Sequence, residues 1–288
     1  MQLRGIPRRV IEALENPKIG FGNYVLSFVF VMTLRNFLEM FSDDEEIAFG
    51  LFAHYYLSYV CLAMGLILLF HLATKEPVEK VSRVTLPFFG VLVLAPCLDL
   101  LLSLGEGYDI SYMLPGKHDD LVLRFFTFFG SYEDFGVSPG MRIEIALVLI
   151  MSGVYFYIKN ANLLKSILFA FSVYCLIFFY GIMPYVVREF LGIFGLEYDY
   201  SALLMQNFYL LLILILGPWL YCRHNRTYCI EIFKDLRYLR VAHYLIMAVL
   251  GMVLSPKSFN LTDQTLFHLI FLGAAVVLAC LFSLITNN

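Results

Sequence analysis

Residues 29–42 read VFVMTLRNFLEMFS, an apolar run that carries Arg35 and Glu39 one helical turn apart. The run belongs to a window, 20–42, that is long enough to cross about 30 Å of hydrocarbon as a helix. Similar windows recur along the chain, and each is continuously apolar, whereas the strands of a transmembrane barrel alternate apolar and polar residues. The sequence therefore predicts an all-α, polytopic bundle of transmembrane helices.

The composition supports the same class of protein. Of the 288 residues, 60% are hydrophobic and only 15% are charged, and the mean hydropathy is +0.78. A soluble domain of this size needs more polar surface to cover its core. The formal net charge is −3, and no basic stretch indicates a nucleic-acid partner. We expect a multi-pass protein of the cell membrane, with membrane lipids as its partners.

The six cysteines include no C-x-x-C pair, so neither a zinc site nor a redox motif is predicted. Most of them fall in apolar windows, where a cysteine behaves as a small apolar residue. We expect them to pack between helices.

About eight windows are expected to span the membrane: 20–42, 47–73, 84–104, 142–159, 163–187, 201–222, 241–256 and 263–285. Fourteen of the 20 lysine and arginine residues fall in the N-terminal tail and in the segments on its side of the membrane. Five fall on the other side, and Arg35 lies within a span. Because cytoplasmic segments are enriched in lysine and arginine, both termini are predicted to be cytoplasmic.

Three regions follow from this pattern. Residues 1–19 form an amphipathic cytoplasmic segment, 20–222 a six-helix membrane module, and 223–288 a basic cytoplasmic lead followed by two helices. The module contains one long outer loop, 105–141, whose second half is too apolar for a solvated loop and too short to span. We expect a re-entrant or interfacial segment there, or alternatively an aromatic belt that only anchors the protein.

Ionisable residues gather near the outer surface. A helix rises about 1.5 Å per residue, so Arg35, Glu39, His54 and Asp99 of the first three spans come to similar depths. Such side chains are costly against lipid, so they are predicted to face one another or a wet cavity. This outer-leaflet polar cluster is the candidate site, with Arg35 expected to pair with Asp99. Its rim would comprise Tyr55, Tyr59, Arg142, Glu144, Arg188 and Glu189.

Structural explanations compete with this site. Arg35 can extend to the headgroups or pair locally with Glu39, and Asp99 can be a buried structural partner. His54 among tyrosines can be a packed histidine, and solvation alone can explain the charged rim residues. No His, Asp and Glu set has metal-ligand spacing on one helix, so no metal or cofactor is expected in this chain. No catalytic residue can be assigned.

The C-terminal region resembles a known family. Residues 233–256, FKDLRYLRVAHYLIMAVLGMVLSP, and 266–288, LFHLIFLGAAVVLACLFSLITNN, look like the opening of the UbiA-type membrane prenyltransferases. In that family a basic lead precedes the first helix, and the second helix ends at an aspartate motif that binds Mg²⁺ and, through it, a prenyl diphosphate. Here Tyr238 departs from the usual proline of the lead, and the motif would begin at Asn287 or Asn288. The resemblance implies an N-terminal portion that is inactive alone, with Mg²⁺ required only if the motif follows.

Several functions fit these features. The first is a lipid-handling protein, in its most specific form the N-terminal part of a UbiA-like prenyltransferase with a polyprenyl or other lipid substrate. The second is a transporter or binding protein that uses the polar cluster, and the third is a structural accessory subunit.

Overall fold

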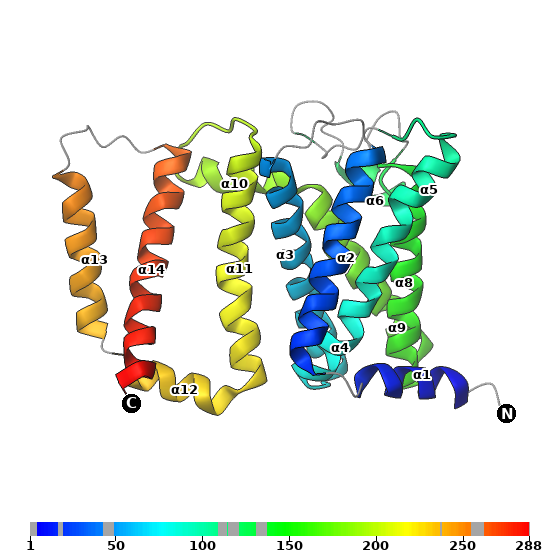
Figure 1. The fold of residues 1–288 in the computed structure, drawn as a ribbon, viewed down its shortest axis with the longest axis horizontal. Coiled ribbons are helices and arrows are strands. Elements are labelled where there is room, and N and C mark those ends of the chain that lie inside the picture. Colours follow the sequence, from blue (N-terminus) through cyan, green and yellow to red (C-terminus); the bar gives the residue numbers. More distant parts are fainter. Residues whose placement is uncertain are drawn as a thin grey trace. The chain divides into compact units, whose positions relative to one another are not determined.

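The computed structural model is all-helical in the residues that it describes (Figure 1). These residues are 5–16, 20–42, 49–108, 114, 121–130, 137–236, 238–254 and 262–287. The chain forms two compact units, Met1–Val186 and Val187–Asn288, with the boundary inside α10 (Met183–Ile193). The boundary expected at residue 223 marks the start of the region that resembles the UbiA-type family, not a boundary between compact units. It stays a prediction.

The first unit is a bundle. It contains α1 (Gly5–Glu15), α2 (Phe21–Ser42), α3 (Phe49–Thr74), α4 (Val78–Phe88), the 3₁₀ helix η1 (Phe89–Val93), α5 (Leu94–Leu102), α6 (Leu121–Phe126), α8 (Pro139–Asn160) and α9 (Leu163–Gly181). Helix α8 packs between α9 and α5, while α2 contacts η1 and α5, and α3 contacts α4 and α9. Helix α1 lies across the ends of the long helices (Figure 1), where it contacts α4 and α8.

The third span is interrupted at Pro87. Because proline has no N–H, the carbonyl of Arg83 loses its helical partner. The hydroxyl of Tyr24, in α2, donates a hydrogen bond to that carbonyl. Beyond Pro87 the chain continues as η1 and then α5, so the helix expected at 84–104 belongs to a longer, interrupted span, Val78–Leu102. The buried hydroxyl of Tyr24 thus joins the first span to the third.

Large apolar side chains cover the outside of the first unit. In α2, Leu26 and Phe30 are each 67% exposed, while Met32 on the inward face is fully buried. Leu164 and Phe171 in α9 are also exposed. A soluble protein avoids such extended apolar patches, whereas a helix that faces hydrocarbon requires them.

Six helices of the described chain are long and apolar enough to cross a membrane. They are Phe21–Met40, Phe52–Thr74, Val78–Leu102, Pro139–Asn160, Leu163–Gly181 and Ala202–His224. The fifth ends before the expected residue 187, because a separate helix, α10, begins at Met183 with Pro184 in its first turn. The apolar parts of the last two helices, Tyr238–Gly251 and Thr265–Leu281, are shorter. Spans seven and eight, and the cytoplasmic position of both termini, stay predictions.

The loop 105–141, which is predicted to lie on the outer side, contains a short helix, α6, that docks on the bundle. Phe125 and Phe129 pack against Tyr174 and Phe178 of α9, and the Tyr174 hydroxyl donates to the carbonyl of Phe125 at 2.5 Å. Phe126, on the other face, is 79% exposed. A docked short helix with an apolar outward face is compatible with a re-entrant or interfacial segment and with an aromatic anchor, so both stay predictions. Parts of the loop on either side of α6 lie outside the described residues.

The second unit contains α11 (Ala202–His224), α12 (Arg226–Asp235), α13 (Tyr238–Val253) and α14 (Asp263–Asn287). Helix α14 contacts both α11 and α13, and α12 lies across the end of α11 (Figure 1). A disulfide, Cys222–Cys229, joins α11 to α12. The expectation that all cysteines are packed free thiols is therefore wrong for this pair. It failed because the pairing depends on the turn between α11 and α12, which no cysteine motif marks.

Candidate functional site

Arg35 and Glu39 form a buried ion pair within α2. Their exposed fractions are 2% and 4%, so neither side chain extends out of the bundle. The guanidinium carbon of Arg35 also lies 5.9 Å from the ring centroid of Tyr59 in α3, a cation–π distance. The local pairing with Glu39 is therefore the one that forms, and burial argues against an arginine that reaches for the headgroups.

Asp99 has a different set of partners from the one expected. Its carboxylate accepts hydrogen bonds from the Ser138 hydroxyl at 2.5 Å and from the Gly140 N–H at 2.7 Å. Ser138 caps the N-terminus of α8, where free N–H groups and the positive end of the helix dipole favour an anion. The expected pairing of Asp99 with Arg35 is wrong, because a helix N-terminus satisfies the carboxylate without a cation.

Glu144 is buried, with 8% of its surface exposed. The charges of Arg35 and Asp99 both act on its carboxylate. In the described part of the chain no donor reaches its Oε2 atom. The explanation by solvation fails for this residue because α8 begins at Pro139, earlier than the expected residue 142, which carries Glu144 further into the helix. We call Arg35, Glu39, Tyr59, Asp99 and Glu144 the buried polar cluster.

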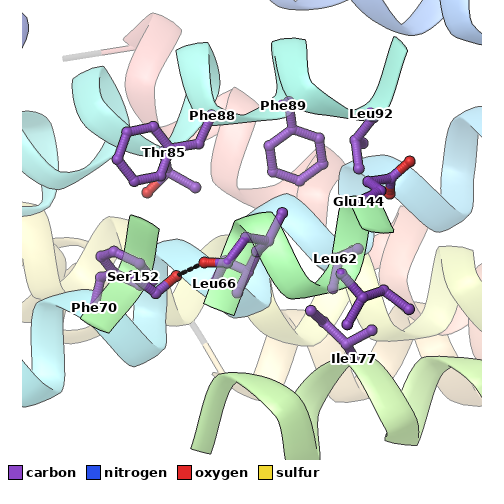
Figure 2. A pocket seen from close by; sticks show the side chains of 12 residues that line it. Leu62, Leu66, Phe70, Thr85, Phe88, Phe89, Leu92, Glu144, Ser152 and Ile177 are labelled. Carbon is purple, nitrogen blue, oxygen red and sulfur yellow. Dashed lines mark hydrogen bonds between the residues drawn. The ribbon is translucent and has the colours of Figure 1, made fainter. Parts of the chain in front are cut away.

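A cavity borders this cluster (Figure 2). Its walls come from α3, α4, η1, α8 and α9, and most of its lining is apolar, including Leu62, Leu66 and Phe70. Glu144 lies at one end. The cavity volume, counted as the space that the centre of a water-sized sphere can reach, is about 50 Å³.

Two hydroxyls also line the cavity, but both are bonded to their own helices. Ser152 donates to the carbonyl of Val148 at 2.7 Å, and Thr85 donates to that of Val81 at 2.9 Å. The carboxyl of Glu144 is therefore the strongest polar group that the cavity offers to a ligand.

The remaining predicted residues lie as follows. His54 is buried in α3, and its ring packs edge-on against that of Tyr55, with 5.6 Å between the ring centroids. Arg142 is partly buried and donates from Nε to a loop carbonyl at 3.3 Å. Arg188 and Glu189 belong to the second unit, where Arg188 is partly exposed, Glu189 is exposed, and the two side chains pair at 3.1 Å.

A second ionic group lies at the other end of α8. Lys159 Nζ lies 2.5 Å from Oε1 of Glu15 in α1 and 2.9 Å from Oε1 of Glu76, and the Tyr155 hydroxyl donates to Glu15 at 3.1 Å. We call these four residues the α1 anchor. Sequence reasoning missed it, although a lysine at the end of a span, on the predicted side of the membrane where Glu15 and Glu76 also lie, is a usable signal. It also missed Arg124, which is fully buried in α6.

Comparisons with protein-family models, with curated proteins and with solved structures return no match. No group of three His, Cys, Asp or Glu side chains could hold a metal ion in the portion of the chain that the structure describes. What the sequence and structure define together is a multi-pass membrane protein.

Proposed function

We propose that this protein handles lipids and that its first unit binds a hydrocarbon chain in the cavity beside Glu144. The observation that carries the proposal is an apolar cavity, lined at one end by a buried carboxyl, inside a bundle of membrane helices. An apolar chamber with a single strong polar group is complementary to an amphipathic molecule.

The size and lining of the cavity favour a chain over water. A single water needs about 10–15 Å³ of such space, and the cavity offers about 50 Å³. Cavities lined by leucine and phenylalanine stay dry and accept apolar guests. The cavity thus fits one segment of a chain, with the rest of the molecule extending beyond it.

The resemblance to UbiA-type enzymes is compatible with this role. In that form of the proposal, the lipid is a prenyl donor or acceptor, and transfer requires aspartates that bind Mg²⁺ beyond Asn288. Residues 1–288 would then bind lipid without prenyl-transfer activity. Reading the gene past Asn288 tests this form: a downstream aspartate motif followed by further spans supports it, and a stop codon there contradicts it.

Chain binding is tested by filling the cavity. Val148 lines the cavity on α8, whereas Val154 on the same helix is 49% exposed. We expect a photoactivatable fatty-acyl phospholipid to label α3 and α8 at the cavity in the unmodified protein and in Val154→Phe. Val148→Phe should lose those adducts and keep the labels on outward faces. Equal labelling of the cavity peptides in all three proteins would contradict the proposal.

Transport is the second candidate. The observation that favours it is that α8 carries ionisable groups at both ends, Glu144 in the buried polar cluster and Lys159 in the α1 anchor. Buried ionisable groups of this kind mark proton and ion pathways in membrane proteins. Proteoliposomes loaded with a pH-sensitive dye would show proton flux that Glu144→Gln abolishes if transport is the function.

A further inference from the structure

We propose that the ligand of the cavity presents a primary ammonium group to Glu144. The ligand class is then a long-chain amine, or a lipid whose polar group carries a protonated primary amine. The inference rests on the proposed function, because it names the polar group of the molecule whose chain fills the cavity.

The composition of the buried polar cluster favours the binding of a cation at Glu144. Within the buried polar cluster, Arg35 and Asp99 influence Glu144 electrostatically. Arg35 is already paired with Glu39, so the cluster holds three carboxylates and one guanidinium. Asp99 is satisfied by a hydroxyl and an N–H group, which leaves Glu144 without a dedicated positive partner. A buried carboxylate in this position is stabilised by an added positive charge.

The carboxyl that would receive this cation lies at the cavity. Glu144 lines the cavity wall and lies at one end of it (Figure 2), and its Oε2 atom accepts no hydrogen bond in the described part of the chain. The lining residue Ser152 lies eight positions further along α8, which is about 12 Å of helix. An amine bound at Glu144 can therefore direct its chain along the apolar walls toward Ser152 and Phe70.

Other polar groups fit this end less well. A carboxylate or phosphate would enter a cluster that holds three carboxyl side chains and one guanidinium, which is already paired. A hydroxyl can donate a hydrogen bond to Oε2 but brings no positive charge to the buried carboxyl. A quaternary ammonium supplies the charge but has no N–H, so Oε2 stays without a donor. A primary ammonium supplies both the charge and the donor.

Three ligands with the same chain separate these cases. We would titrate octylamine, octanol and octyltrimethylammonium at neutral pH into the full chain in phosphatidylcholine nanodiscs, by calorimetry, with empty nanodiscs subtracted. Octylamine should bind about tenfold more tightly than either of the others. Glu144→Gln should remove this preference, and Glu106→Gln, which alters an exposed carboxylate of the same unit, should keep it.

The outcomes distinguish the two proposals. If octylamine and octanol bind the unmodified protein equally and Val148→Phe abolishes both, the amine inference is overturned while chain binding stands. If no ligand binds saturably, or Val148→Phe changes nothing, chain binding falls and the amine inference falls with it. The comparison within the unmodified protein decides the matter even where Glu144→Gln does not fold.

Discussion

Gly140→Ala tests the contact that joins the third and fourth spans. Gly140 is the second residue of α8, and a Cβ atom added there would lie 2.7 Å from Oδ1 of Asp99 and 2.8 Å from its Cγ. The added atom would also meet the backbone carbonyl of Ala95 in α5. Because a backbone carbonyl cannot rotate away, α5 and α8 must separate to admit the methyl group.

The magnitude follows from three effects. Overpacking of a tight site costs about 1–3 kcal/mol. Separation also weakens the hydrogen bond from Gly140 N–H to the Asp99 carboxylate, and bonds to charged groups contribute about 1.5–3 kcal/mol. The higher helix propensity of alanine offsets at most about 1 kcal/mol. We expect a net loss of about 2–5 kcal/mol in the free energy of unfolding.

Thermal unfolding in detergent, followed by fluorescence, measures this loss. In domains of about 150–250 residues, 1 kcal/mol shifts Tm by about 2–4 °C, so Gly140→Ala should lower Tm by roughly 4–20 °C. Gly153→Ala is the matched control, because a Cβ there lies 3.6 Å from that of Ala170, an ordinary contact. If Gly140→Ala melts at or above the unmodified protein, as the control should, the close approach of α5 and α8 is refuted.

Four further predictions concern the ionic groups, the disulfide and the topology. Arg35→Ala breaks the buried ion pair with Glu39 and should destabilise by about 3–5 kcal/mol; the double variant with Glu39→Ala should cost clearly less than the sum of the single changes in detergent unfolding. Lys159→Met removes the ammonium from buried Glu15 and leaves Glu76 with its 3.8 Å contact to Lys80, so unfolding free energy should fall by about 1.5–3 kcal/mol and hydrogen exchange in α1 should accelerate. Mass spectrometry of the denatured chain after maleimide treatment should count four labels without reductant and six with it; six in both cases would exclude the disulfide. Cysteines introduced near residues 44 and 230 should be labelled from opposite sides of the membrane, and labelling of both from one side would overturn the predicted orientation.

The helical class and six of the spans could be predicted from sequence because lipid imposes a simple rule. A helix must be apolar over its whole length to cross hydrocarbon, and that property is local to each window. The interruption of the third span at Pro87 is also a local effect, since proline removes one N–H. The partner that compensates it, Tyr24, lies in another helix and is fixed only by packing.

Partners within the site were harder to predict than positions. The four residues predicted to form the centre of the site are all buried: Arg35, Glu39, His54 and Asp99. Their burial agrees with the expectation that ionisable side chains within a span avoid lipid. Depth does not give direction around a helix, so it cannot say which buried groups face each other. The choice of Glu39 over Asp99 as the partner of Arg35 depends on the rotation of α2 and α5 about their axes. The predicted pairing with Asp99 rested on similar depth, and the local alternative with Glu39 differs in intrinsic helix preference by only a few tenths of a kcal/mol.

The partners of Asp99 change which residue of the buried polar cluster is available for function. A carboxylate that receives two donors from the N-terminus of α8 is a structural residue, because its bonds hold α5 against α8. Arg35 and Glu39 are similarly occupied by each other. The residue left over is Glu144, which sequence reasoning placed only on the rim. It combines burial, an acceptor atom that receives no hydrogen bond from the described residues, and a position on the cavity wall. A ligand therefore gains most by meeting Glu144, since every other charge in the cluster would first have to give up a partner.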